Sequence, residues 1–140
     1  MAGVLGCRVP KSNRRKLARI FLESNCYHRK ERVNIMELLD SRMDFQGCKI
    51  ALICGDKVLT ILRDDKENIP WPNMWELPGG GREGNESPFE CAAREVYEEL
   101  GIHLNEDCLL WGKIYPSVIF EGKQSVFMVG QLRQEQFDNI

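Results

Sequence analysis

The stretch Gly80–Ile102, GGREGNESPFECAAREVYEELGI, decides the fold and holds the candidate chemistry. A glycine-rich bend leads into a segment whose two ends are both marked as helix ends. Ser87 and Glu90 form a capping box, in which each side chain bonds the backbone amide of the other residue. Pro88 occupies the first helical position, and Gly101 stands where a left-handed residue commonly ends a helix. The sequence therefore predicts a helix that begins at Pro88 and ends one residue before Gly101. Its apolar face consists of Phe89, Ala92, Ala93, Val96 and Leu100.

Another face of this helix gathers three carboxylates. Glu95, Glu98 and Glu99 stand at positions i, i+3 and i+4, so their side chains point to the same side. Mutual repulsion and the negative end of the helix dipole both disfavour this arrangement. A hard divalent cation favours it, because Mg²⁺ binds carboxylate oxygens together with water and substrate phosphates. The alternative is a solvated acidic face that Arg94 partly neutralises.

The spacing of the fixed residues decides between these interpretations. The stretch matches the pattern GX5EX7REUXEEXGU, in which U is an aliphatic residue, at every fixed position. The matching residues are, in order, Gly80, Glu86, Arg94, Glu95, Val96, Glu98, Glu99, Gly101 and Ile102. A chance match is expected on the order of once in 10⁷ chains of this length at average residue frequencies. In this pattern the chain resembles the Nudix hydrolases, and Trp75-Glu76-Leu77-Pro78-Gly79-Gly80 is similar to the strand and bend that lead into their motif.

The resemblance implies an α/β fold, a Nudix-like α/β/α sandwich around a mixed sheet. It implies hydrolysis of a nucleoside diphosphate linked to another moiety, by attack of water at phosphorus with Mg²⁺ or Mn²⁺ as cofactor. A non-catalytic domain of the same fold that binds a nucleotide or RNA is the alternative. The expected partner is a small nucleoside diphosphate derivative. No membrane and no nucleic acid partner is expected, and a homodimer is compatible with the sequence.

The resemblance also implies roles for single residues. Glu95, Glu98 and Glu99 are implied as catalytic metal ligands, with Glu95 the first candidate for the general base. The Gly80 carbonyl is implied as a further ligand. Arg94 is counted with the catalytic residues, and its pairing with Glu86 is implied to hold the bend and the helix in register, while Gly101 has a structural role. These assignments concern Glu86, Arg94, Glu95, Glu98, Glu99, Gly80 and Gly101.

Candidate substrate contacts precede the motif. Lys49–Cys54 and Lys57–Arg63 are predicted to form a hairpin around the turn Gly55-Asp56, with strands covered on both faces. Arg63 is a candidate phosphate contact, with an ordinary surface arginine as the alternative. In and after the loop Asp64–Asn73, Trp71 and Trp75 offer aromatic faces for a base or sugar, with simple packing as the alternative.

The rest of the domain is predicted to be short. Leu109–Phe120 and Ser125–Leu132 are predicted strands, and no periodic apolar pattern of a closing helix follows Gln131. Nudix domains usually end with further strands and a second helix. Because no such helical pattern follows Gln131, the C-terminal part is expected to be short and to lack that helix.

Composition and charge bound the class of protein. With 140 residues, 43% hydrophobic and 29% charged, the chain fits one globular domain, and no apolar run approaches a membrane span. Its six cysteines form no C-x-x-C pair, which indicates reduced thiols and a cytoplasmic protein.

The charge is unevenly distributed. Residues 1–32 hold nine Lys or Arg against two Glu, and the remainder holds ten against nineteen acids. We therefore expect residues 1–45 to form a basic extension with short helices at Arg14–Glu23 and Asn34–Met43, and residues 46–140 to form the hydrolase domain. The extension is interpreted as solvated chain, a docking helix, or a transit-like or nucleic-acid-binding arm.

Overall fold

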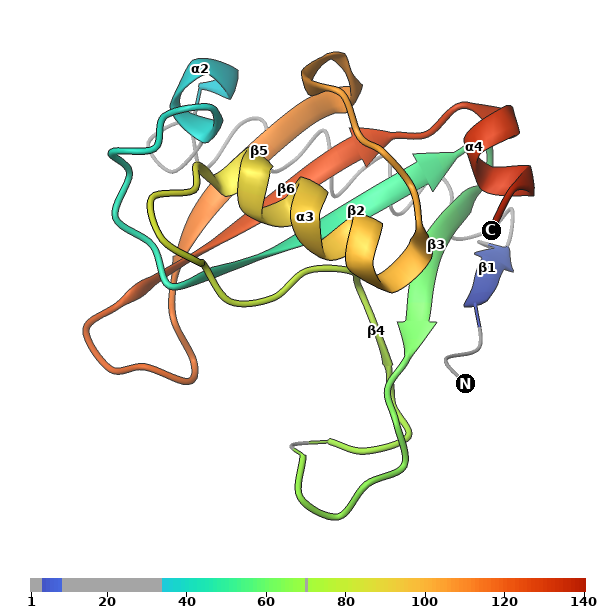
Figure 1. Cartoon of the computed structure of the whole chain (residues 1–140), viewed down its shortest axis with the longest axis horizontal. Helices are drawn as coiled ribbons and strands as arrows, with labels where there is room; N and C mark the ends of the chain where they lie inside the picture. The colour runs from blue at the N-terminus through green and yellow to red at the C-terminus, as the bar shows by residue number, and fades with distance from the viewer. Residues whose placement is uncertain (1–3, 9–33, 70) are drawn as a thin grey trace.

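The structure, a computed structural model, describes residues 4–8, 34–69 and 71–140 (Figure 1). The predicted helix at Arg14–Glu23 lies outside the described residues. The elements are β1 (Val4–Arg8), α2 (Ile35–Leu38), β2 (Gly47–Cys54), β3 (Lys57–Leu62), β4 (Trp75–Glu76), α3 (Pro88–Leu100), a 3₁₀ helix (Glu106–Cys108), β5 (Leu109–Pro116), β6 (Gln124–Gln131) and α4 (Gln134–Asp138).

The strands form one mixed sheet in the order β1-β3-β2-β6-β5, and β4 also pairs with β3. The neighbours β2 and β6 run parallel, with Ile50 opposite Met128, while the other strand pairs among the described residues are antiparallel. Gly55, at φ 58°, opens the predicted two-residue turn between β2 and β3. The α/β class and the mixed sheet are confirmed.

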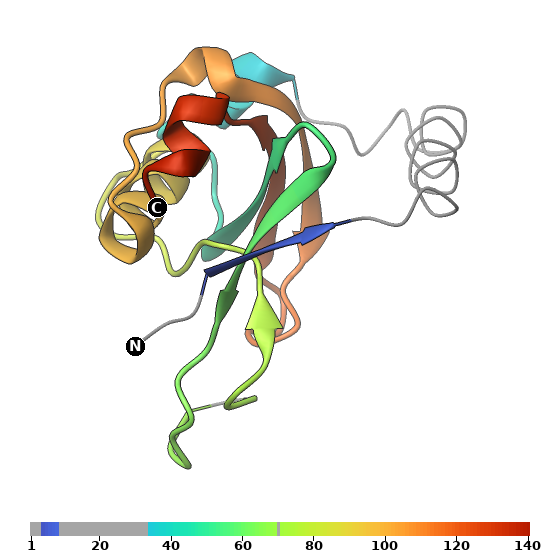
Figure 2. The same ribbon diagram turned by 90° about the vertical axis from the view of Figure 1, so that its right-hand side faces the viewer.

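Helix α3 crosses one face of the sheet, and α4 lies on the same side (Figures 1 and 2). Residues from α3, from β2 and from β6 fill the core between helix and sheet, with Ile50, Val96 and Met128 all fully buried. Leu38 of α2 also packs into this core. The helices of the described residues therefore cover one face, and the opposite helical layer that the resemblance implies is not among these residues.

Strand β2 alternates between buried and partly exposed residues rather than being covered equally on both faces. Cys48, Ile50 and Leu52 face α3 and are buried, while Lys49 and Ala51 point to the other face and stay partly exposed. The expectation that both faces of the strand are covered was wrong for the second face, because an apolar run also suits a strand whose second face has only partial cover.

Three other elements differ from their predicted lengths. The helix expected at Asn34–Met43 is only four residues long, because the Asp40 carboxylate accepts from the Arg42 amide at 2.9 Å and forms a turn. Strand β5 stops at Pro116 rather than Phe120, because the Ser117 hydroxyl accepts from two amides of the following loop. A closing helix does exist as α4, which at five residues is too short to show helical periodicity in the sequence.

Within the first 45 residues, the two described segments, 4–8 and 34–45, are in contact with the rest of the described chain. Strand β1 pairs with β3 from Val4 to Arg8, and Leu38 and Phe45 are buried in the core. The boundary at residue 45 stays a prediction, but the described segments before it belong to the same sheet and core. None of the helices in the described ranges is long and apolar enough to cross a membrane.

Candidate active site

The acidic helix has the limits that its sequence predicts. Ser87 Oγ accepts from the Glu90 amide at 3.2 Å, and Glu90 Oε2 accepts from the Ser87 amide at 2.8 Å. Gly101 has φ 69° and donates its amide to the Tyr97 carbonyl at 2.8 Å. These local bonds fix both ends of α3, and with them the direction of its acidic face.

The glycine bend lies between α3 and β2 and packs closely against the strand. The Gly80 carbonyl accepts from the Cys48 amide at 2.9 Å, and the Pro78 carbonyl accepts from the Ile50 amide at 2.9 Å. Gly79 has φ 131°, and a Cβ at this residue would lie 2.3 Å from the Cys48 carbonyl oxygen. The bend therefore needs glycine for its backbone conformation and for its contact with the strand.

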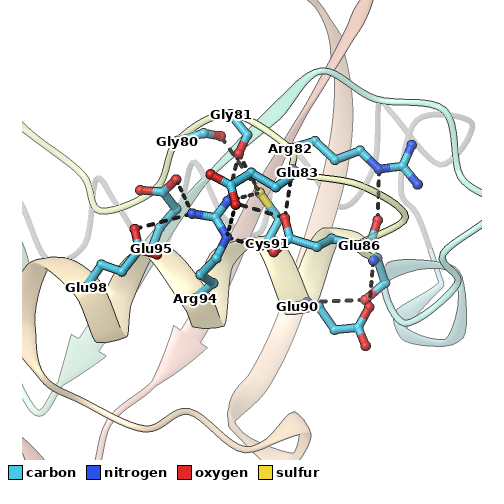
Figure 3. A network of polar contacts seen from close by, with 11 residues as sticks. Gly80, Gly81, Arg82, Glu83, Glu86, Glu90, Cys91, Arg94, Glu95 and Glu98 are labelled. Atoms are coloured by element: carbon cyan, nitrogen blue, oxygen red, sulfur yellow. Dashed lines mark hydrogen bonds and ion pairs between the residues drawn. The ribbon is translucent and has the colours of Figure 1, made fainter.

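Arg94 is the centre of the polar network that joins bend and helix (Figure 3). Its Nε donates to Glu86 at 2.7 Å, and its Nη2 donates to the Gly81 carbonyl at 2.8 Å. Its Nη1 donates to Glu95 at 2.8 Å and, more weakly, to Glu98 at 3.4 Å. The contact between Glu86 and Arg94 that the motif implies is thus present. The Arg94 side-chain hydrogen bond holds the pKa of Glu86 below its usual range, and the pKa of Arg94 is raised in turn, chiefly by Glu86.

Glu99 lies on the other side of the bend from Arg94. Although the residue as a whole is exposed, its Oε2 accepts from the Gly79 amide at 3.3 Å in a partly buried contact. Burial of the carboxyl group raises the pKa of Glu99 to about 7, against the opposing effects of the Gly79 hydrogen bond and of Lys49. The ionisation of Glu99 therefore depends on its surroundings in the fold.

The three acidic side chains of α3 offer the ligand atoms that a hard cation prefers, but they are not arranged as a metal site. Glu95, Glu98 and Glu99 offer only oxygen, as Mg²⁺ and Mn²⁺ prefer. Within the described ranges, however, no group of three or more His, Cys, Asp or Glu side chains is arranged to hold a metal. The Nη1 of Arg94 bonds both Glu95 and Glu98, so its positive charge partly offsets theirs instead. The Gly80 carbonyl accepts from the Cys48 amide at 2.9 Å and, weakly, from the Cys91 thiol at 3.9 Å, so a cation at this oxygen would replace the thiol contact.

A cavity of about 940 Å³ opens beside the bend. It brings together Gly80, Glu99, Arg63, Trp71 and Trp75 from the predicted site. The predicted site residues Glu86, Arg94, Glu95, Glu98 and Gly101 do not line it. Trp71 and Trp75 expose 59% and 46% of their surface, so they are not packed as core residues.

Sequence reasoning missed two parts of this cavity. The first is the connection between β5 and β6, which contributes Tyr115, Ser117, Val118, Ile119 and Phe120. Nothing local in the sequence indicated that this connection faces the motif. The second is the pair Lys49 and Glu76, which lie in the cavity wall. Their signal was a lysine inside an apolar strand and a glutamate just before the bend.

Comparison with known proteins gives consistent matches. Residues 47–138 match the family model described as NUDIX domain. The m7GpppN-mRNA hydrolase NUDT17 of Danio rerio is 29% identical over 82 residues, which are 54% of this chain and 27% of that protein. Diphosphoinositol polyphosphate phosphohydrolase 2 of Rattus norvegicus is 56% identical over 32 residues, 23% of this chain and 18% of that protein.

A solved structure shows a distant likeness. It is a bifunctional NMN adenylyltransferase/ADP ribose pyrophosphatase from Francisella tularensis, complexed with AMP and Mn, with 20% identity and a TM-score of 0.48. The match covers 86% of this chain and 32% of that one. The chain spans about a fifth to a quarter of the length of the two relatives named above. Since the family model covers well over half of the chain and includes the whole motif, the chain belongs to the NUDIX domain family.

Proposed function

We propose that this protein is a metal-dependent hydrolase that cleaves the diphosphate of a nucleoside diphosphate linked to another moiety. One observation carries the proposal: the acidic face of α3 lies against a glycine bend that also forms the wall of a cavity of about 940 Å³. Substrate and metal ligands would meet at this bend. The names of the relatives, which include an mRNA cap hydrolase and a diphosphoinositol polyphosphate phosphohydrolase, support cleavage of a phosphoanhydride.

The roles of the acidic residues follow from their positions. Glu95, Glu98 and Glu99 would hold Mg²⁺ or Mn²⁺, with the Gly80 carbonyl as a further ligand in place of its weak contact with the Cys91 thiol. When bound, the metal neutralises phosphate charge and lowers the pKa of a bound water. Once the hydrogen bond from Arg94 to Glu95 is broken, the Glu95 carboxylate would accept the proton of the attacking water.

The remaining residues position these groups. Arg94 and Glu86 hold the bend against the helix, since the guanidinium bonds the Glu86 carboxylate and the Gly81 carbonyl at once. Trp71 and Trp75 offer flat apolar surfaces in the cavity wall for a nucleobase. We also propose a cytoplasmic location, supported by the free state of the four described cysteines. A homodimer stays a proposal.

A second function is favoured by one observation. Arg94 takes the position between Glu95 and Glu98 where a cation would reduce their repulsion. If Arg94 keeps that position when ligand is present, the domain would bind a nucleotide or RNA without hydrolysing it. The two functions differ in whether added metal displaces the guanidinium.

The test combines turnover with metal-dependent melting. Wild type and Glu98→Gln are incubated with saturating Mg²⁺ or Mn²⁺ and a panel containing ADP-ribose, nucleotide sugars, nucleoside triphosphates and a capped dinucleotide. Wild type should hydrolyse part of the panel and melt at a higher temperature with metal, because the metal binds only the folded state. Glu98→Gln should lose several orders of magnitude in turnover and gain less stability from metal.

The matched control is Glu106→Gln, an exposed acid of the 3₁₀ helix that is outside the site. It should behave like wild type in both measurements. A wild type that binds panel members, shows no hydrolysis and does not respond to metal would instead support the binding domain.

A further inference from the structure

Three charged side chains form a chain of contacts in the wall of the cavity, outside the Nudix motif. Glu76 of β4 accepts from Arg63 Nη1 at 2.9 Å with both of its oxygens, and its Oε2 accepts from Lys49 Nζ at 2.8 Å. All three residues line the cavity. They come from β2, from the end of β3 and from β4, and we refer to them as the Arg63–Glu76–Lys49 cluster.

The cluster contains two cationic side chains and only one carboxylate. Two cations share the single carboxylate of Glu76, so these three side chains together carry one net positive charge, and Glu99 is the other acid among the described residues that line the cavity. The side chains of Arg63 and Glu76 are each 23% exposed, and that of Lys49 is 39% exposed. An excess charge in a partly buried wall attracts an anion more strongly than the same charge does in open solvent.

Arg63 also has unused hydrogen-bonding capacity. Its Nη1 makes the bonds to Glu76, while its Nε is buried and has no hydrogen-bond partner among the described residues. A buried donor without a partner costs free energy, so such a group is usually explained by a ligand or by water. A phosphate oxygen matches the geometry of a guanidinium, which presents several donors in a plane.

Lys49 connects this cluster to the acidic helix. Its Nζ donates to the Gly79 carbonyl at 2.9 Å as well as to Glu76. The Gly79 amide in turn donates to Glu99 at 3.3 Å. An anion bound at Lys49 would therefore lie beside the bend that α3 supports, within reach of the proposed site of hydrolysis.

A purely structural role is the competing explanation. In that case the cluster would only attach β4 to β3 and fix the bend. Lys49 would serve that role through its bond to the Gly79 carbonyl, but the buried, unpartnered Nε of Arg63 would remain unexplained. The arrangement is better explained if Glu76 holds both cations ready in the absence of ligand and yields them when an anion enters.

We propose that the Arg63–Glu76–Lys49 cluster is the phosphate-binding element of the cavity, in which a phosphate group of the substrate competes with Glu76 for Lys49 and Arg63. Glu76 thereby weakens anion binding and selects against ligands that do not reach both cations. The identity of the anion as a substrate phosphate rests on the proposed function, but its binding requires neither metal nor turnover.

The test measures the dissociation constant of inorganic pyrophosphate by calorimetry, in the presence of EDTA and at low salt. Lys49→Met and Arg63→Met should each weaken binding by about tenfold, as expected for loss of one charge-assisted contact. Glu76→Gln should tighten binding severalfold, because the substitution keeps the shape and removes the competing negative charge. A structural cluster predicts the opposite sign for Glu76→Gln, or no change.

The matched controls come from a second acid–arginine pair. Asp40 and Arg42 form a bidentate contact on the surface, with Arg42 88% exposed, and neither residue lines the cavity. Asp40→Asn and Arg42→Met should leave pyrophosphate binding unchanged. Melting curves confirm that each variant is folded at the temperature of the measurement, and Lys49→Gln replaces Lys49→Met if the latter is not.

The outcomes separate this inference from the proposed function. If the variants change pyrophosphate affinity in the predicted directions but the protein hydrolyses no substrate of the panel, the anion site is supported and the hydrolase proposal is contradicted. Hydrolysis with pyrophosphate affinities that are equal in wild type, Lys49→Met and Glu76→Gln would keep the hydrolase and overturn the anion site. If neither wild type nor Glu76→Gln binds pyrophosphate, the cluster is structural.

Discussion

Gly80 and Glu95 are in such close contact that a Cβ built on Gly80 would lie 2.4 Å from Glu95 Oε1. The bend thus passes directly over a carboxylate of the acidic helix, and any side chain at residue 80 would push this carboxylate aside. The first glycine of the motif and its first helical acid, 15 positions apart in the sequence, are one packing unit. The motif therefore encodes a contact as well as a set of candidate ligands.

This contact predicts that Gly80→Ala is damaging. The added methyl group must displace the Glu95 carboxylate, the far end of a flexible side chain, so stability should fall little while most of the turnover should be lost. Gly81→Ala is the matched control, because a Cβ at Gly81 meets only the Gln46 carbonyl oxygen, at 4.0 Å. Chemical denaturation and turnover on one substrate check both variants, and equal effects of the two would contradict the contact.

The pair Glu86 and Arg94 predicts strong energetic coupling. Both side chains are about one-fifth exposed, and they are joined by bonds of 2.7 and 3.3 Å. A double-mutant cycle with Glu86→Gln and Arg94→Gln should give a coupling free energy of about 0.5–3 kcal/mol. The exposed pair Asp40 and Arg42 is the control cycle and should give about 0–1 kcal/mol. Additive losses at Glu86 and Arg94 would show that the pair does not hold bend and helix together.

The same pair predicts a pH dependence. The side-chain hydrogen bond from Arg94 lowers the pKa of Glu86 from its ordinary 4.5. A carboxyl group whose pKa is lower in the folded state stabilises the fold above its unfolded pKa, and loses this contribution as the pH falls through the folded pKa. The stability difference between wild type and Glu86→Gln should therefore shrink as the pH is lowered from about 6 to 3. Melting temperatures over this range in EDTA check it, and a constant difference would contradict it.

The exposed tryptophans of the cavity predict an effect on substrate binding. Trp71→Ala and Trp75→Ala each remove an aromatic surface worth about 1–3 kcal/mol for a stacked base. KM for a nucleoside-containing substrate should rise by about 5–150-fold, with little change in kcat. Met36→Ala is a control, since Met36 is 69% exposed and does not line the cavity. Unchanged KM for both tryptophan variants would assign the two rings to surface packing.

The core contact of α2 predicts that the segment before residue 45 cannot be removed freely. Leu38 is fully buried, and its side chain fills the space where a Cβ on Gly112 would stand, 2.7 Å from Leu38 Cδ1. Leu38→Ala should lower the free energy of unfolding by about 2–5 kcal/mol. Met36→Ala, on the exposed side of the same helix, should change it by less than about 0.5 kcal/mol. A Leu38 variant as stable as wild type would show that α2 is not part of the core.

Helix α3 and its acidic face were predictable from the sequence because their causes are local. The capping box joins residues three positions apart, Gly101 follows directly on the last turn, and three carboxylates at helical spacing share a face in any helix. Short elements were predicted less well. Helix α4 has five residues and the shortened α2 has four, and so few residues show no helical periodicity in the sequence.

The sequence by itself thus determined the limits of α3, the need for glycine in the bend, and membership of the NUDIX domain family. Only the tertiary structure decided that β2 pairs in parallel with β6, and that Lys49, Arg63 and Glu76 meet in one wall of the cavity. It also decided that Arg94 lies between Glu95 and Glu98. These contacts join residues whose approach depends on packing of the whole sheet and core, whereas helix caps depend on neighbours within a few positions along the chain.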